Sequence, residues 1–279
     1  PGHIIQFTSD NIELKKWYNL NSFTDNHDNK AIIHEKLRDY FDRAVKRRLI
    51  SDVDLGVFLS GGLDSSLIVS SLAEQGYSLP CFTMGFEGAS DYYEERPQAK
   101  RLAKYFGMEH QSFEINEKSI LNKIPEILNA RDEPFADTSA LPFYMLSKEV
   151  SSSVKVVLSG DGGDEVFGGY RKHLGEKWSS FSNLIPKFIR TIIIKALIEN
   201  KNTYYGEISR RIRRFLINTY KDGSLRQAGY LEQINEDSIK QLFGVNIENT
   251  RRLLDVHRKS FKDPINAMLA ADIGFSLAG

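Results

Sequence analysis

The chain has 279 residues, of which 41% are hydrophobic, and this is enough for one well-packed core or for a core with a helical extension. Its 37 acidic and 37 basic side chains cancel, so the charge gives no support for nucleic-acid binding as a main task. A single cysteine, Cys81, leaves no internal disulfide and no cysteine-based zinc site. No stretch approaches ~18 uninterrupted apolar residues and no signal peptide is visible, so we expect no membrane span and a cytoplasmic location.

The predicted elements begin with an irregular N-terminal segment and a long helix. Residues 1–29 are rich in turn-forming and polar residues and predict a linker, with Trp17 and Tyr18 as its anchors. Residues 30–50 have apolar positions close to helical spacing and predict the first helix.

An alternation of strands and helices follows. The apolar patterns predict strands at 55–59, 79–86, 110–115 and 154–158, and helices at 65–75, 94–106, 117–129 and 139–152. Strands that alternate with helices predict a parallel, doubly wound sheet of the α/β class. From about residue 175 onward the patterns are helical, without a convincing strand.

The segment after the first strand of this alternation has the chemistry of a phosphate-binding loop. The apolar run Leu55–Leu59 stops at Ser60-Gly61-Gly62, and the apolar spacing of a helix begins at Leu63. Amides at a helix start are free and carry partial positive charge, and glycines let the backbone approach an anion closely. The strand, turn and helix together predict a site for phosphate.

The same loop lacks the lysine of a Walker A motif and has Asp64 in the comparable place. A carboxylate beside a polyphosphate repels it unless a divalent cation lies between them. Asp64 therefore predicts Mg²⁺, which prefers carboxylate and phosphate oxygens. The structural alternative is that Asp64 only caps the helix.

A second loop of this kind follows the last predicted strand. Val154–Leu158 leads into Ser159-Gly160-Asp161-Gly162-Gly163-Asp164-Glu165. Glycines and acidic side chains contribute little to a hydrophobic core, so this segment suits a ligand-binding loop. Ligands bind beyond the carboxyl ends of strands in open α/β sheets, so the two loops can converge on one crevice. Asp64 and Asp164 could then hold one Mg²⁺ from opposite sides. The alternative is an acidic surface loop with capping aspartates and no metal.

These motifs resemble those of a known enzyme group. Ser60-Gly61-Gly62-Leu63-Asp64-Ser65 resembles the pyrophosphate-binding loop (PP-loop) of the ATP pyrophosphatases, which adenylate a carboxylate or carbonyl oxygen and release pyrophosphate. Residues 159–165 and the tail Val166–Tyr170 resemble the second motif of glutamine-dependent asparagine synthetases. The segment 132–142 is typical of the same family. Pro1-Gly2-His3 is similar to the stretch that joins the glutaminase half of these enzymes to the synthetase half.

The resemblance implies an adenine nucleotide alpha hydrolase-like fold and an ATP-dependent synthetase. Aspartate would be adenylated on its side chain, and ammonia from glutamine would convert the adenylate to asparagine. Family members carry Glu or Asp at the position of Asp161, where an acid could accept a proton from attacking ammonia. The residue matching Met84 lies against the adenine base in the family, although a simple packing role for Met84 is nearly as well supported.

The loop chemistry and the resemblance together predict a set of site residues. Nucleotide contacts are predicted for Leu59, Ser60, Gly61, Gly62, Asp64, Ser65, Ser66, Met84, Ser159 and Gly160, metal ligation for Asp64 and Asp164, and catalysis for Asp161. The predicted cofactors are ATP and Mg²⁺, and the predicted partners are small-molecule substrates, a glutaminase domain of the same full-length chain and a possible second copy in a homodimer, without nucleic acid or membrane.

The resemblance also divides the chain and leaves alternatives open. It implies a linker at 1–29 from a missing glutaminase domain, an ATP pyrophosphatase core at 30–175 and a truncated helical extension at 176–279. A catalytic lysine of the family is expected beyond residue 279, so we expect a fragment that turns over poorly. The alternatives are a related enzyme acting on another acid, such as a β-lactam synthetase, a tRNA-thiolating pyrophosphatase, and a nucleotide-binding module without catalysis.

Overall fold

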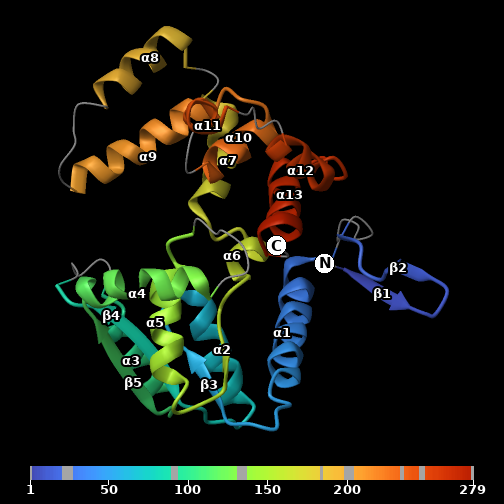
Figure 1. Cartoon of the computed structure of the whole chain (residues 1–279), viewed down its shortest axis with the longest axis vertical. Helices are drawn as coiled ribbons and strands as arrows, with labels where there is room; N and C mark the ends of the chain where they lie inside the picture. Colours follow the sequence, from blue (N-terminus) through green and yellow to red (C-terminus); the bar gives the residue numbers. More distant parts are fainter. Residues whose placement is uncertain are drawn as a thin grey trace. The chain divides into compact units, whose positions relative to one another are not determined.

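The computed structural model describes residues 2–20, 28–88, 94–130, 137–182, 185–197, 204–232, 236–244 and 249–277. The chain forms two compact units, which Figure 1 traces from the N-terminus in blue to the C-terminus in red. Residues 27–161 make an α/β unit, and residues 1–26 together with 162–279 make a second, mainly helical unit.

The α/β unit contains every strand and helix that the sequence predicts for it, with ends that differ by three residues or fewer. Its elements are α1 (Lys30–Arg47), β3 (Leu55–Phe58), α2 (Leu63–Glu74), β4 (Cys81–Phe86), α3 (Arg96–Tyr105), β5 (His110–Ile115), α4 (Glu117–Asn129), α5 (Ala140–Val150) and β6 (Val156–Leu158).

The four strands of this unit form one parallel sheet in the order β5-β4-β3-β6. The chain moves from β3 outward to β4 and β5 and then returns to place β6 on the other side of β3. Val57 of β3 is paired with Cys81 on one side and with Leu158 on the other. The strand order therefore reverses between β3 and β6, which is where open α/β sheets bind ligands.

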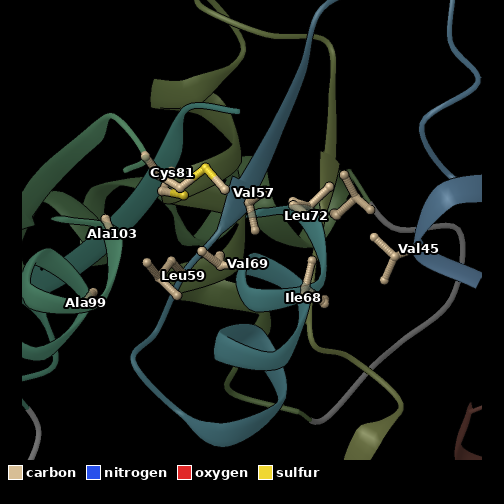
Figure 2. Close-up of a cluster of buried hydrophobic side chains, with 11 residues drawn as sticks. Val45, Val57, Leu59, Ile68, Val69, Leu72, Cys81, Ala99 and Ala103 are labelled. Carbon is tan, nitrogen blue, oxygen red and sulfur yellow. The ribbon is translucent and has the colours of Figure 1, made fainter. Parts of the chain in front are cut away.

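Side chains that alternate along the strands build a core on each face of the sheet. Val57 and Leu59 belong to one buried cluster and Phe58, between them, belongs to the other. Figure 2 shows the first cluster, in which side chains of α1, α2 and α3 meet those of the strands: Val45, Val57, Leu59, Ile68, Val69, Leu72, Cys81, Ala99, Ala103, Met108 and Leu158. The second cluster joins Phe58 and Phe82 to Leu146 and Val150 of α5. Helices thus cover both faces, which confirms the predicted doubly wound α/β fold.

The sequence predicts no strand in residues 1–29, whereas residues 3–16 contain two, and the role of this segment as a linker stays a prediction. These residues form a two-stranded antiparallel hairpin of β1 (His3–Phe7) and β2 (Ile12–Lys16), closed by a turn in which the Thr8 amide donates to the Asn11 carbonyl at 2.9 Å. The adjacent pair Ile4-Ile5 obscures the alternation that marks a strand. Trp17 is 68% exposed, so it does not act as the predicted anchor.

In the second unit, the described residues after about 175 are helical, as the patterns predict, and the segment predicted as a ligand loop also contains the short helix α6 (Gly163–Phe167). The other elements after residue 162 are α7 (Arg171–Ser182), α8 (Lys187–Ala196), α9 (Tyr204–Asn218), α10 (Gly223–Leu231), α11 (Glu236–Phe243), α12 (Asn249–Arg258), α13 (Pro264–Ala271) and the π-helix η2 (Asp272–Leu277). Compactness divides the chain after Asp161, whereas the boundary near residue 175 stays a prediction about the family's domains. Among the described residues, no helix combines the length and the apolar character needed to cross a membrane.

A buried carboxylate joins the last described helix of this unit to α7 and α10. Asp272 is fully buried, and its two oxygens accept hydrogen bonds from Lys172 Nζ at 2.7 Å, His173 Nε2 at 2.8 Å and Gln227 Nε2 at 2.9 Å. Burial raises the pKa of this carboxyl group, but the bonds from His173 and Lys172 outweigh burial, so the net pKa is below its ordinary value.

A second buried carboxylate extends the network. Glu176 of α7 accepts from Arg226 Nε of α10 at 2.6 Å and from Arg258 Nη2 of α12 at 3.3 Å. Arg258 Nη1 also donates to Gln227 Oε1 at 2.6 Å, which links Glu176 to the Asp272 group. Four helices that are distant in sequence are therefore joined by charged hydrogen bonds, and loss of one partner would leave a buried charge unpaired.

The position of Cys81 makes it a reporter for the α/β unit. Its thiol is fully buried, and burial raises its pKa to about 11, so the reactive thiolate is scarce at pH 8. We expect a thiol reagent to label the folded chain very slowly at pH 8 and to label one thiol per chain quickly in denaturant. Rapid complete labelling in native buffer would contradict the packing described for β4.

Helix α2 offers a matched pair of leucines for testing the first core cluster. Leu72 is fully buried and Leu67 is 43% exposed. Because Leu72→Ala leaves a cavity against β3, we expect it to lower the free energy of unfolding by about 2–5 kcal/mol. The same change at Leu67 should alter it by about 0.5 kcal/mol or less. The urea dependence of Cys81 labelling measures both, and equal effects would show that α2 packs differently.

The Asp272 network predicts a pH-dependent stability of the helical unit. Asp272→Asn removes the charge that pairs with Lys172 and His173, so we expect a loss of about 3–5 kcal/mol at pH 7. Asp263→Asn is the control, because Asp263 caps the start of α13 at an exposed position and Asn caps equally well.

Both tryptophans, Trp17 and Trp178, belong to this unit, so their fluorescence follows its unfolding. The pKa of Asp272 is lower in the folded chain than in the unfolded chain. Its stabilisation is therefore complete above the unfolded pKa of about 3.9 and is lost as the pH falls through the folded pKa. The difference between wild type and Asp272→Asn should shrink below about pH 4, and a difference that stayed constant down to pH 2 would contradict this account.

Candidate active site

The loops that follow β3 and β6 meet at the carboxyl end of the sheet. Gly160, two residues after β6, lies against the first turn of α2, where a Cβ atom at residue 160 would be 2.9 Å from the Ser65 amide nitrogen and 3.0 Å from Asp64 Cβ. A side chain at this position would collide with the first turn of α2. Glycine therefore lets the β6 loop approach the start of α2 closely, where the first amides of the helix lie.

The first loop is shaped by its own serines. Gly61 has a φ of +78°, a conformation that glycine adopts without strain. The Gly62 amide donates to Ser60 Oγ at 3.1 Å, and Ser60 Oγ shares a hydrogen bond of 3.0 Å with Ser65 Oγ. Ser66 Oγ donates to the Gly62 carbonyl at 2.5 Å. These bonds fold residues 60–66 into one compact turn onto α2.

The start of α2 is not capped by a side chain. Gly62 is its N-cap residue, and Asp64 is the second residue of the helix, where its carboxylate does not cap. The interpretation of Asp64 as a simple cap therefore has no support in the structure. An uncapped helix start keeps its first amides for an outside acceptor, and phosphate is one of the anions that such positions bind.

A buried pair of side chains holds the end of β3. Thr83 of β4 donates its hydroxyl proton to the Leu59 carbonyl at 2.5 Å, and the Thr83 oxygen lies 2.9 Å from His110 Nε2. Because the Thr83 proton is already committed, His110 Nε2 must be the donor in the second bond. Burial, with a smaller effect of Lys100, lowers the pKa of His110 and favours this neutral imidazole. This partner of His110 is not visible in the sequence, because it lies on another strand.

An ion cluster lies at the carboxyl ends of β4 and β5. Arg96, at the start of α3, contacts Glu94 at 2.6 Å and Glu114 of β5 at 2.9 Å. The hydrogen bonds from Arg96 lower the pKa of Glu94. A Cβ atom at Gly85 would be 2.2 Å from Arg96 Nε, so glycine at this position of β4 makes room for the guanidinium.

Met84 packs against a core cluster, whereas Asp161 is exposed on its loop. Met84 packs, partly buried, against the Phe58–Phe82 cluster, which fits its packing role, and its contact with an adenine base stays a prediction. Asp161 is exposed, and its Oδ2 accepts from Ser159 Oγ at 2.8 Å. Its carboxylate is therefore oriented by the loop and open to solvent.

Asp164 belongs to the helical unit, in the short helix α6. Its carbonyl accepts from the amides of Gly168 at 2.9 Å and Gly169 at 3.1 Å, and a Cβ atom at Gly169 would be 1.8 Å from Asp164 Oδ1. Glycine at residue 169 thus makes space for the Asp164 carboxylate. Tyr170 OH donates to the buried Glu165 at 2.7 Å, which fixes the rest of the motif.

The predicted site residues therefore divide between the units. Those of the α/β unit lie in and beside the β3 and β6 loops: Leu59, Ser60, Gly61, Gly62, Asp64, Ser65, Ser66, Met84, Ser159, Gly160 and Asp161. Asp164 lies in the helical unit, and its shared metal role with Asp64 stays a prediction. Within the described ranges, no cluster of three or more His, Cys, Asp or Glu side chains is arranged to hold a metal ion. The acidic pair Asp132-Glu133 lies outside the described residues.

Three curated relatives that this chain matches are all named as asparagine synthetases. The chain is 33% identical over 233 residues to the nodule asparagine synthetase (glutamine-hydrolyzing) of Pisum sativum, a stretch that covers 76% of this chain and 38% of the relative. It is 42% identical over 136 residues to asparagine synthetase (glutamine-hydrolyzing) 1 of Bacillus subtilis strain 168, covering 49% of this chain and 21% of the relative. A relative from Methanocaldococcus jannaschii is 37% identical over 243 residues, covering 84% of this chain and 45% of the relative.

Weaker similarity extends to solved structures. A glutamine-dependent NAD⁺ synthetase from Acinetobacter baumannii, solved with ADP, superposes with a TM-score of 0.35 at 17% identity, covering 83% of this chain and 50% of that chain. An NH₃-dependent NAD synthetase from Campylobacter jejuni gives a TM-score of 0.33 at 16% identity, covering 70% of this chain and 97% of that chain.

The chain spans less than half the length of the curated relatives named here. The family profile described as asparagine synthase matches residues 36–278, which include the β3 loop, the β6 loop and most of both units. With the sheet order, the two glycine-serine loops and this match together, the chain belongs to the asparagine synthase family of ATP-dependent ligases.

Proposed function

We propose that this chain carries the synthetase chemistry of an asparagine synthetase: it adenylates the side-chain carboxylate of aspartate, and ammonia then displaces AMP from the adenylate to give asparagine. The observation that carries the proposal is the uncapped start of α2 inside the Ser60–Ser66 turn, with Gly160 of the second loop packed against it. Relatives named as glutamine-hydrolyzing support glutamine as the source of ammonia, released by a glutaminase domain of the full-length protein.

ATP would bind with its triphosphate on the β3 loop. The first amides of α2 are donors at the start of this helix, and an anion at this point also meets the positive end of the helix dipole. The hydroxyls of Ser60, Ser65 and Ser66 now bond within the turn and would contact the phosphates by rotating their protons outward. Leu59, Ser159 and Gly160 border the same turn and would complete the nucleotide pocket, with Met84 as the proposed contact to adenine.

The donor chemistry at this end of the sheet fits Mg²⁺. Asp64, one residue from Ser65, places a carboxylate beside the proposed triphosphate, and Asp164 is the proposed second ligand. Mg²⁺ is held by one or two carboxylates together with substrate phosphates rather than by a dedicated protein cage. When bound, the ion would neutralise charge on the phosphate oxygens.

The reaction then needs two displacements. A side-chain carboxylate oxygen of aspartate attacks the α-phosphorus of ATP, the bond from that phosphorus to the β-phosphate bridging oxygen breaks, and pyrophosphate leaves. The preorganised donors of the Ser60–Ser66 turn stabilise the charge of this leaving group. Ammonia next attacks the acyl carbon of the adenylate, AMP leaves, and the exposed carboxylate of Asp161 is the proposed acceptor of the ammonia proton.

The function is tested by exchange of labelled pyrophosphate into ATP, which reports adenylation alone. We expect exchange that depends on aspartate and that falls at least about tenfold in Asp64→Asn, because the variant weakens the charge balance beside the triphosphate. Asp54→Asn is the matched control, since Asp54 is an exposed residue before the opposite end of β3. The control should exchange at the wild-type rate.

Each other outcome changes a specific part of the proposal. Exchange that requires a different carboxylic acid would replace aspartate as the substrate, as in an enzyme that forms another amide or a lactam. Nucleotide binding without exchange for any acid would make this chain a nucleotide-binding module. Equal rates for Asp64→Asn and wild type would remove Asp64 from the metal site.

A further inference from the structure

The peptide group between Gly61 and Gly62, in the loop that follows β3, is hydrogen-bonded through both its carbonyl oxygen and its amide. The carbonyl oxygen of Gly61 accepts a hydrogen bond of 2.8 Å from Gln98 Nε2, and the amide of Gly62 donates to Ser60 Oγ at 3.1 Å. Gln98 lies in the first turn of α3, 37 residues further along the chain. The orientation of the Gly61–Gly62 peptide plane is therefore set by one side chain inside the loop and one outside it.

This peptide group has little intrinsic preference for one orientation. It lies between two glycines, and Gly61 is at a φ of +78°, so no Cβ atom opposes its rotation. Because the C=O and N–H of a trans peptide point in opposite directions, a half-turn would exchange a carbonyl oxygen for an amide at each side of the loop. In a loop that receives phosphate, an exposed carbonyl oxygen would repel the ligand.

Helix α3 is placed to prevent this rotation. Gly61 is buried beneath it, and a Cβ atom at residue 61 would be 3.1 Å from Gln98 Cγ and 3.2 Å from the Ala99 amide. The side chain of Gln98 therefore packs against Gly61, and its amide donates to the Gly61 carbonyl oxygen. Ala99 is fully buried in the first core cluster, which anchors this turn of α3 to the sheet.

We infer that Gln98 is a positioning residue for the triphosphate of ATP: it fixes the Gly61–Gly62 peptide with its carbonyl turned toward α3 and so preserves the donor pattern of the Ser60–Ser66 turn. The inference rests on the proposed function, because it requires that this turn binds the phosphates. It assigns to α3 a role in nucleotide affinity that the loop motif alone does not contain.

The test separates the hydrogen bond of Gln98 from its packing. Gln98→Met keeps the length and volume of the side chain but removes the donor, and Gln98→Ala removes both. Because one such hydrogen bond contributes about 0.5–1.5 kcal/mol, we expect either variant to bind Mg·ATP about 3- to 10-fold more weakly, as measured by calorimetry. Adenosine, which has no phosphate, should bind both variants as it binds wild type, measured by ligand-detected NMR.

Gln75→Met is the matched control. Gln75 also uses its side-chain amide, donating to the Asp42 carbonyl at 3.1 Å and to Ser71 Oγ at 3.0 Å, but it lies at the far end of α2. We expect its affinity for Mg·ATP to equal that of wild type.

The outcomes are distinguishable. Wild-type affinity for Mg·ATP in both Gln98 variants would overturn the inference and leave the proposed function standing. Equal losses for adenosine and Mg·ATP would also overturn it, because they would indicate a general loosening of the unit. A wild-type chain that bound no Mg·ATP would overturn the proposed function, and this inference with it.

Discussion

The parallel pairing of β3 with a strand on each side is the constraint on which the candidate site depends. Val57 is paired with Cys81 of β4 and Leu158 of β6, so the chain leaves the end of β3 at the point where the strand order reverses. The β3 and β6 loops must then emerge side by side. The placement of Gly160 against α2 follows from this pairing, and the lack of a side chain at residue 160 permits the close approach.

Support from outside the loops gives the site its shape. Thr83 and His110 hold the Leu59 carbonyl, Gln98 holds the Gly61 carbonyl, and the Arg96 cluster fills the neighbouring strand ends. The residues that contact ATP in our proposal therefore depend on β4, β5 and α3, although none of these elements contains a recognised phosphate motif. In the helical unit, the charged network around Asp272 has the corresponding role of joining helices that are distant in sequence.

The sequence predicted the α/β unit well because its strands are short apolar runs and its helices have regular spacing, signals that depend on neighbouring residues. It also located both loops, since Ser-Gly-Gly turns after buried strands are local patterns. It failed at the β1–β2 hairpin, where the paired register of Ile5 with Leu14 is not visible in either strand alone. It could not find Gln98, Thr83 or Asp272, because each acts on a partner that only the fold brings near.

The central claim is that the Ser60–Ser66 turn binds the phosphates of ATP, and backbone amide NMR during titration with Mg·ATP tests it most directly. The account predicts that the largest chemical-shift changes fall on the amides from Gly61 to Ser66 and on Gly160, and that adenosine leaves these amides nearly unchanged. Large changes confined to other parts of the chain, or identical changes with adenosine, would contradict it.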